Sequence, residues 1–186
     1  VYVHRSIVDD FTAALVARVE ALVVGDPLDE ATDVSALISA GETARVKGWI
    51  DDAVREGAGL ATGGGQRDRL LIETVLTGIT PTMEVSANEV FGPVVGIAPF
   101  DHLDEALALA NDTRYGLQAA IFTKELEGAL RAAHELDFGG VLVNEVPTFR
   151  TDQMPYGGIG DSGNTKEGPH YAVREMTHER LVVLAR

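Results

Sequence analysis

Hydrophobic runs and helical periodicity alternate regularly in the second half of the chain. Apolar runs occupy residues 94–100, 116–123 and 139–144, and segments with an apolar residue every three or four positions cover 103–113 and 125–137. Near-continuous apolar strands that alternate with amphipathic helices are typical of a parallel sheet covered on both faces. The pattern therefore predicts an α/β fold with three layers, α/β/α, and a mostly parallel sheet.

The first half carries weaker signals of the same kind. We expect strands at 1–6 and 70–79, helices at 9–25 and 41–56, and a loop over 25–39 that is rich in Asp, Pro, Thr and Ser. A helix at 171–176 and a strand at 179–186 are expected to end the chain. Because no internal repeat or low-complexity linker interrupts the pattern, we expect one domain.

Two of the helices make specific predictions about the core. The residues expected to point inward are Val46, Trp49, Ile50 and Val54 in the helix over 41–56, and Leu126, Leu130, Ala133 and Leu136 in the helix over 125–137.

Composition narrows the classes of function. The 186 residues include 15 basic and 29 acidic side chains, a net charge of −14, which argues against nucleic-acid and anionic-membrane partners. There is no cysteine, so disulfides, thiolate metal sites and a cysteine nucleophile are excluded on this chain. No apolar run reaches the roughly 18 residues of a membrane span, and no signal peptide is visible. We expect a cytoplasmic protein, and a start inside a strand without Met indicates a fragment.

The stretch ANEVFGPVVGIAPF at 87–100 places a carboxylate and a ring directly before a buried strand. Gly92 permits a tight backbone, and Pro93 prevents a helix so that the strand can begin. Glu89 and Phe91 then have two interpretations. In the first, Glu89 is a solvated acid and Phe91 a core residue next to the start of a strand. In the second, both side chains face a ligand.

A second candidate region is the loop PTFRTDQMPYGG, which follows the strand at 139–144. Ligands of parallel sheets bind beyond the carboxyl ends of the strands. Phe149 and Tyr156 are therefore candidates for the walls of a substrate site, and the guanidinium of Arg150 for an anionic substrate group. The alternative is a surface loop whose aromatic residues cap the core. For Asn144, which ends the strand, support of this loop is favoured over catalysis.

Other residues give no comparable signal. None of the five histidines has metal-ligand spacing to another histidine or to an acidic cluster, so we predict no metal site. The glycines at 63–65 lack the strand–GxGxxG–helix context of a dinucleotide site and predict a turn. Ser162 does not lie in a GxSxG elbow, which argues against a serine hydrolase.

Four motifs in order along the chain resemble the C-terminal half of the aldehyde dehydrogenases. They are GDPLDEATDV at 25–34, EVFGPVV at 89–95, NDTRYGL at 111–117 and MPYGGIGDSG at 154–163. The last part of the chain is most similar to bacterial members that act on small aldehydes such as lactaldehyde or, without phosphorylation, glyceraldehyde 3-phosphate. The sequence departs from the usual pattern at Asn88, where an acid is common, and at Gly160, where a lysine is usual.

The resemblance implies oxidation of an aldehyde to a carboxylic acid with NAD or NADP. In this family a cysteine thiolate forms a thiohemiacetal and then a thioester, and the cysteine, the glutamate that activates water and the dinucleotide-binding domain all precede the region matched by this chain. It also implies an aldehyde dehydrogenase-like C-terminal domain over residues 1–179 that lacks the nucleophile segment. Residues 180–186 would form a terminal oligomerisation strand in a homo-oligomer, a dimer or a tetramer.

The family also suggests roles for the candidate side chains. By position, Glu89 would accept hydrogen bonds from the ribose hydroxyls of the nicotinamide half of the cofactor, and Phe91 would lie beside the nicotinamide. Phe149, Arg150 and Tyr156 would line the aldehyde tunnel. No catalytic residue is expected on this chain.

Three functions remain open at this point. In the first, the chain is part of an NAD(P)-dependent aldehyde dehydrogenase, and by itself it is inactive and binds the cofactor at most weakly. Alternatively it is a truncated, non-catalytic homologue that dimerises or binds a ligand. A third possibility is a split enzyme, in which a separate chain supplies the missing N-terminal half with its cysteine.

Overall fold

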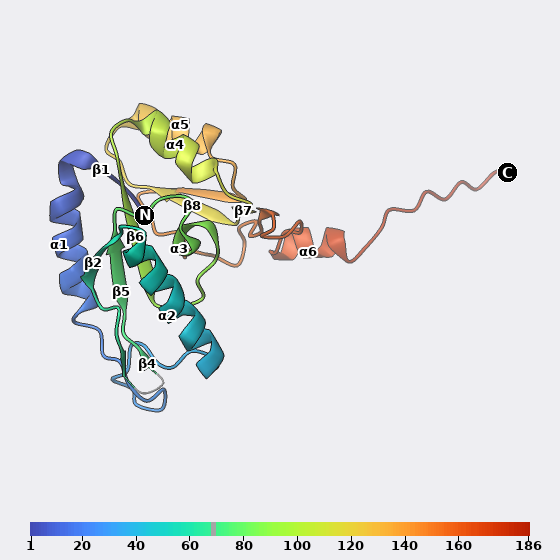
Figure 1. The fold of residues 1–186 in the computed structure, drawn as a ribbon. Coiled ribbons are helices and arrows are strands. Elements are labelled where there is room, and N and C mark those ends of the chain that lie inside the picture. Colours follow the sequence, from blue (N-terminus) through green and yellow to red (C-terminus); the bar gives the residue numbers. More distant parts are fainter. Residues whose placement is uncertain (68–69) are drawn as a thin grey trace. The chain divides into compact units, whose positions relative to one another are not determined.

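The structure, a computed structural model, describes residues 1–67 and 70–186. It divides into two compact units, residues 1–106 and 107–186. The elements of the first unit are β1 (Tyr2–His4), the 3-10 helix η1 (Arg5–Ile7), α1 (Val8–Val19), α2 (Ala40–Arg55), β2 (Gly59–Thr62), β3 (Gln66–Arg67), β4 (Leu70–Leu71), β5 (Thr74–Thr77), α3 (Glu84–Ala87) and β6 (Val94–Phe100) (Figure 1). The helix α4 (Leu103–Asn111) crosses the boundary between the units.

The first unit is built around a four-stranded sheet in the order β1-β6-β5-β2. β6 pairs in parallel with both of its neighbours, with Tyr2 opposite Ala98 and Thr74 opposite Val94. β2 pairs antiparallel with the other side of β5 and is an edge strand of the sheet. The mostly parallel α/β fold predicted from the sequence is therefore confirmed, with one antiparallel edge strand.

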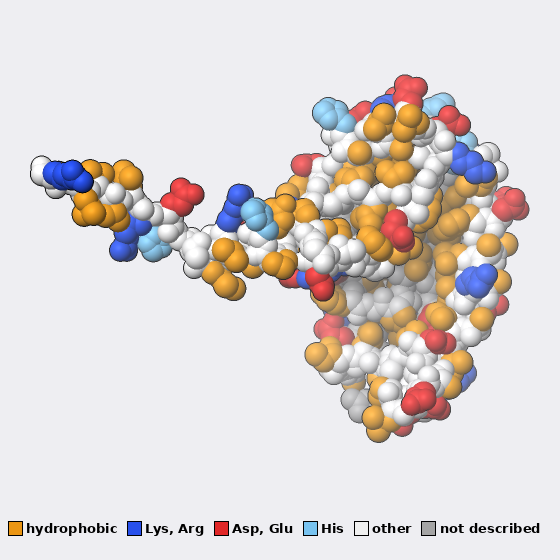
Figure 2. All heavy atoms as spheres, turned by 180° about the vertical axis from the view of Figure 1, so that it is seen from behind, with side chains coloured by type: hydrophobic (Ala, Val, Ile, Leu, Met, Phe, Trp, Pro, Cys, Tyr) orange, Lys and Arg blue, Asp and Glu red, His pale blue; other side chains and the backbone are white. Residues whose placement is uncertain are grey.

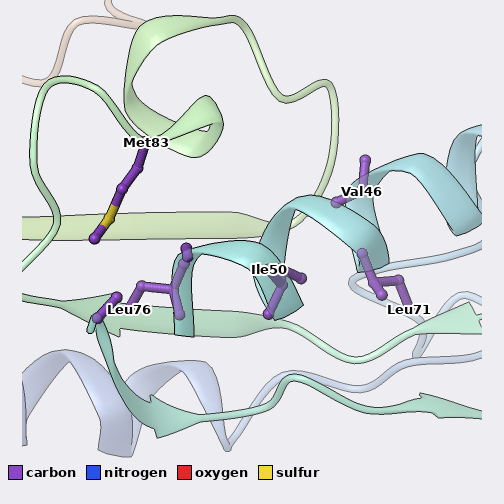
Figure 3. Packing of buried hydrophobic residues seen from close by; sticks show 7 residues of the cluster. Val46, Ile50, Leu71, Leu76 and Met83 are labelled. Atoms are coloured by element: carbon purple, nitrogen blue, oxygen red, sulfur yellow. The ribbon is translucent and has the colours of Figure 1, made fainter. Parts of the chain in front are cut away.

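Two hydrophobic clusters fill the two faces of this sheet. On one face Val46, Ile50 and Ala53 of α2 pack with Leu71, Leu76 and Met83 (Figure 3). On the other face Val75 and Ile97 pack with α1 residues. Neighbouring strand residues point to opposite faces, and Val75 and Leu76 accordingly belong to different clusters. The sheet thus lies between α1 and α2, as Figure 1 shows.

The second unit contains one parallel strand pair and several short elements. They are β7 (Tyr115–Gly116), β8 (Gln118–Ile121), α5 (Leu126–Glu135), β9 (Gly140–Val143), β10 (Ile159–Gly160) and α6 (Pro169–Glu175). β8 and β9 pair in parallel and are joined through α5, which gives a β–α–β unit. β10 pairs antiparallel with β7.

Asn144 ties the ends of this strand pair together. Its backbone N–H donates to the Ile121 carbonyl at 2.8 Å, and its Oδ1 accepts from the Thr123 N–H at 2.8 Å. Its φ is +57°, a conformation that Asn tolerates better than most residues. These contacts agree with the structural role favoured for this residue.

The expected inner face of α5 is wrong in three of its four positions. Leu126 and Leu130 are 73% and 62% exposed and Ala133 is also exposed, whereas the neighbouring Ala132 is fully buried and Leu136 is 9% exposed. The helix contacts β9, and the small residue Ala132 makes the close approach, so the two large side chains lie on the open side. In α2, Val46 and Ile50 are buried as predicted and Trp49 is partly buried, but Val54 is 40% exposed.

Several boundaries also differ from those expected. The first helix ends at Val19 rather than near residue 25, and the expected strands at 70–79 and 116–123 are each divided in two. Residues 177–186 form no helix or strand, and their hydrophobic side chains lie along an extended terminal segment (Figure 2), with Leu181 89% and Leu184 90% exposed. The oligomerisation strand stays a prediction, because a strand that pairs with a neighbouring subunit needs that subunit.

Candidate functional site

In the first unit, the candidate residues Glu89 and Phe91 lie on a short turn between α3 and β6. The Val90 side chain between them packs against the core cluster of α2. Glu89 is exposed, and Phe91 is 73% exposed. The carboxylate and the ring therefore project outward from a backbone that is anchored in the core, and the interpretation of Phe91 as a core residue is wrong.

The backbone at Phe91 is strained. Its φ is +47°, and among the described residues only Asn144 is a second non-glycine residue with positive φ. An aromatic L-residue in this region is disfavoured sterically, and such strain is often found at functional sites. The turn thus holds an exposed ring in a conformation that the residue would not adopt alone.

The residues after the turn fix it to the sheet. The Thr74 N–H donates to the Pro93 carbonyl at 2.9 Å, and the Val94 N–H donates to the Gly92 carbonyl at 2.8 Å. A Cβ at Gly92 would come within 3.0 Å of Val46 Cγ1. Glycine is thus favoured at this position by the close approach of α2.

In the second unit, the structure brings together two of the three other candidates. Arg150 donates to Glu167 Oε2 at 2.6 Å, and its guanidinium carbon lies 4.6 Å from the centre of the Tyr156 ring. The backbones of Tyr156 and Glu167 form an antiparallel bridge. Phe149 is 45% exposed, with its N–H bonded to the Val146 carbonyl.

Glu167 was not among the residues singled out from the sequence. It sits 17 positions after Arg150, and no local pattern links the two. Its carboxylate partly neutralises the guanidinium, so an anionic ligand must share Arg150 with Glu167 or displace it. Arginine has five N–H donors, and the remaining donors can serve a second acceptor.

Close backbone packing holds this loop in place. A side chain at Gly139 would overlap the Gly157 carbonyl, and one at Gly157 would overlap the Thr165 carbonyl. Ser162 Oγ accepts from the Gly116 N–H at 3.1 Å, and Lys166 Nζ donates to the Gly157 carbonyl at 3.2 Å. The segment MPYGGIGDSG is thus a packing motif, and Ser162 has a structural role in it.

The segment NDTRYGL likewise serves structure. Asn111 Nδ2 donates to the Glu135 carbonyl at 2.8 Å, and Asn111 Oδ1 accepts from the Asp137 N–H at 2.9 Å, so this side chain caps the end of α5. Arg114 donates to the Tyr115 hydroxyl at 2.7 Å, which raises the pKa of Arg114 above its ordinary value.

The candidate side chains of the first unit do not line either of two hollows found in that unit. A hollow of about 260 Å³ is lined by residues that include Glu20, Arg67 and Glu73, and a more apolar one of about 580 Å³ lies between α1 and the sheet. Neither is lined by Glu89 or Phe91. Glu89 and Phe91 therefore lie on an open surface of the unit.

Within residues 1–67 and 70–186, no three His, Cys, Asp or Glu side chains lie together as they would around a metal ion. Within the same ranges, no helix has the length and hydropathy needed to cross a lipid bilayer.

Comparison with known proteins agrees with the motifs. The sequence profile described as "Aldehyde dehydrogenase family" matches residues 1–182. The 3-sulfolactaldehyde dehydrogenase of Priestia aryabhattai is 46% identical over 184 residues, which are 99% of this chain and 39% of that protein. The lactaldehyde dehydrogenase of Methanococcus vannielii is 41% identical over the same share of each.

Solved structures share the fold. The glyceraldehyde-3-phosphate dehydrogenase GapN of Methanocaldococcus jannaschii, complexed with NADP, matches with a TM-score of 0.90 and 39% identity over 94% of this chain and 38% of its own. An aldehyde dehydrogenase of Mycobacterium tuberculosis, complexed with NAD+, matches with a TM-score of 0.91 and 31% identity over 99% of this chain and 39% of its own. The chain therefore spans about two fifths of the length of the relatives it matches.

Proposed function

We propose that this chain, which belongs to the aldehyde dehydrogenase family, is the C-terminal catalytic-domain part of an enzyme that oxidises a small aldehyde to a carboxylic acid with NAD or NADP. The family is shown by the profile match over residues 1–182. The observation that carries the role of the chain is the strained turn that presents Glu89 and Phe91 outward beside the sheet.

The residues of the turn fit a nicotinamide nucleotide. The exposed carboxylate of Glu89 can accept hydrogen bonds from two neighbouring ribose hydroxyls. The exposed ring of Phe91 limits the positions that a nicotinamide can take beside it. When bound, NAD or NADP supplies the acceptor for the hydride that leaves the aldehyde carbon. The contribution of this chain is to fix the sugar and to orient the ring.

The loop of the second unit is proposed to contact the aldehyde. Phe149 and Tyr156 supply apolar walls, and Arg150 supplies a cation that Tyr156 and Glu167 hold in place. Relatives are named for lactaldehyde, 3-sulfolactaldehyde and sulfoacetaldehyde. We therefore propose a small aldehyde as the substrate, and Arg150 favours one that carries an acidic group.

The attack on the aldehyde must come from a cysteine outside this chain, because the chain contains none. That thiolate adds to the carbonyl carbon to give a thiohemiacetal, loss of hydride gives a thioester, and water releases the acid. The chain alone is therefore proposed to be inactive. The exposed segment over 180–186 is proposed to pair with a neighbouring subunit in a homo-oligomer.

A chimera tests the proposal. The matching segment of the Priestia aryabhattai 3-sulfolactaldehyde dehydrogenase would be replaced by this chain, and NADH or NADPH formation would be followed by absorbance. The chimera should turn over 3-sulfolactaldehyde, and the purified chain alone should not. Turnover by the chain alone contradicts the proposal. A chimera that folds, by its melting temperature, but shows no turnover favours the non-catalytic alternative.

Variants of the chimera separate the roles. Glu89→Gln and Phe91→Ala should lower kcat, because the nicotinamide is less well oriented. Arg150→Gln should lower kcat/KM for 3-sulfolactaldehyde by about 10-fold to 100-fold, the range for a lost charge-assisted hydrogen bond, with less effect on the neutral lactaldehyde. Arg174→Gln is the control, since Arg174 is an exposed arginine of α6 in the same unit. Equal losses on both aldehydes would argue against anion recognition by Arg150.

A further inference from the structure

Arg45 of α2 contacts the backbone of the candidate cofactor turn. Its terminal nitrogen donates to the Val90 carbonyl at 2.8 Å, and its Nε donates to Glu42 Oε2 at 2.8 Å. The guanidinium carbon lies 4.4 Å from the centre of the Trp49 ring. A carboxylate, an aromatic face and a carbonyl thus fix this side chain from three directions, and it is only 28% exposed.

The contact falls on the residue between Glu89 and Phe91. The Val90 side chain is held by the core cluster of α2, and its carbonyl is held by Arg45. Because the Val90 carbonyl and the Phe91 nitrogen belong to one planar peptide group, fixing that carbonyl also limits the φ of Phe91. This is the torsion with the strained value of +47°.

We propose that Arg45 is a positioning residue, which holds the Glu89–Phe91 turn in its strained conformation by its hydrogen bond to the Val90 carbonyl. The proposal rests on the proposed function of that turn. Arg45 touches neither cofactor nor substrate in this scheme. It acts by presenting the carboxylate and the ring in one fixed arrangement, which lowers the ordering that must accompany binding.

A second arginine of α2 shows that an ion pair with the acid three residues earlier does not by itself explain the position of the Arg45 side chain. Arg55 also pairs with an acid three residues before it, Asp52. Its side chain is 72% exposed, and Asp52 is its one polar partner within residues 1–67 and 70–186. The pair of Arg45 has the same spacing, yet its guanidinium is turned onto Trp49 and Val90. The planar guanidinium allows these contacts together, and a lysine cannot reproduce them.

Hydrogen exchange on the chain itself tests the contact. Amide exchange would be measured by mass spectrometry in peptides that cover the turn, α2 and β6. Arg45→Gln should speed exchange at Val94, whose N–H donates to the Gly92 carbonyl of the turn, by about 10-fold to 100-fold, as expected for loss of a hydrogen bond from a charged donor. Arg45→Lys should have a similar effect and keeps the charge and the helix. Arg55→Gln should leave the turn unchanged.

The fluorescence of Trp49, the single tryptophan of the chain, provides a check. It should change in both Arg45 variants and not in Arg55→Gln. If Arg45→Gln raises exchange throughout the unit, it has lost its fold, and Arg45→Lys then gives the decisive result. If exchange at Val94 stays at the parent rate in Arg45→Lys, the inference is overturned.

Kinetics of the chimera distinguish this inference from the proposed function. Arg45→Gln should lower kcat with little change in melting temperature, and Arg55→Gln should change neither. Faster exchange together with lower kcat supports both proposals. If Glu89→Gln and Phe91→Ala leave kcat unchanged, the cofactor role of the turn is overturned, whatever the exchange shows. If the Arg45 variants show faster exchange but an unchanged kcat, the proposal that Arg45 positions the turn for catalysis is overturned.

Discussion

Replacing Phe91 with glycine should give a more stable chain than replacing it with alanine. At an ordinary exposed position the order is the reverse, because glycine loses more backbone entropy on folding. Phe91 is not ordinary, since its φ is +47°. Glycine adopts this conformation without a steric penalty, whereas alanine keeps the penalty of phenylalanine.

The magnitude follows from two opposing terms. The Phe91 ring is 73% exposed, and both variants lose it equally, so its contacts cancel in the comparison. The left-handed conformation costs an L-residue about 1–2 kcal/mol, and the added entropy of glycine costs about 0.5–1 kcal/mol. We expect Phe91→Gly to exceed Phe91→Ala by about 0.5–1 kcal/mol in free energy of unfolding. For a chain of this size that is about 1–4 °C in Tm.

Urea unfolding followed by Trp49 fluorescence is a suitable assay, because Trp49 and Phe91 belong to the same unit. Ile38 is the control position in that unit. It is 96% exposed and its φ is not positive, so Ile38→Ala should be more stable than Ile38→Gly. If alanine is also the more stable substitute at position 91, the strain argued for this turn does not exist in solution.

Three further predictions concern packing, pH and assembly. Gly139→Ala should destabilise the chain by about 1–3 kcal/mol or more in urea unfolding, because its Cβ overlaps the Gly157 carbonyl; parent-like stability would contradict this packing. The hydrogen bond from Arg5 lowers the pKa of Asp101, so its stabilising effect is present above the usual carboxyl range of about pH 4 and is lost as pH falls through the lowered pKa. Asp101→Asn should therefore have a lower Tm than the parent at pH 7, and the difference should shrink in acid; a constant difference would refute the linkage. Deleting Leu181–Arg186 should make the chain more monomeric or insoluble by light scattering, and a parent chain that is already monodisperse and monomeric would exclude the terminal strand as its oligomerisation element.

Strong local patterns were sufficient to predict the regular elements. The apolar run at 94–100 is β6 from end to end, and the helix expected over 41–56 is observed at Ala40–Arg55. Ser39 begins that helix as a cap, with its hydroxyl bonded to the Glu42 N–H. In both segments one pattern extends over the whole element, and Val46 and Ile50 of the helix are buried as it predicts, although Val54 is not.

Predictions failed where packing, rather than periodicity, decides which residues are buried. The leucines of α5 have helical spacing, but the helix approaches its strands with Ala132, and Leu126 and Leu130 remain exposed. The run at 116–123 reads as one strand, but Gly116 pairs with Ile159 of the distant loop, while Gln118 pairs with Gly140. Sequence periodicity contains no information about such partners.

In the candidate sites too, local sequence patterns were predictable and contacts between distant residues were not. The motif around Glu89 and Phe91 could be found from sequence, through its likeness to the family. The positive φ of Phe91 and the contact from Arg45 could not, because the contact joins residues 45 positions apart. The pair of Arg150 with Glu167 was missed for the same reason.

In both candidate sites, exposed side chains with proposed chemical roles are held by contacts with other residues, either through the backbone or directly. Phe91 is held through Val90 by Arg45, and Arg150 is held by Glu167 and Tyr156. An exposed side chain that must order on binding loses conformational entropy, so a group fixed beforehand makes binding less costly. It follows that substitutions at the supporting residues should weaken binding without removing a contact to the ligand. Substitutions at residues that bind the nucleotide or the aldehyde and substitutions at the residues that support them should therefore have different effects on hydrogen exchange. This difference should be seen even where their effects on turnover are alike.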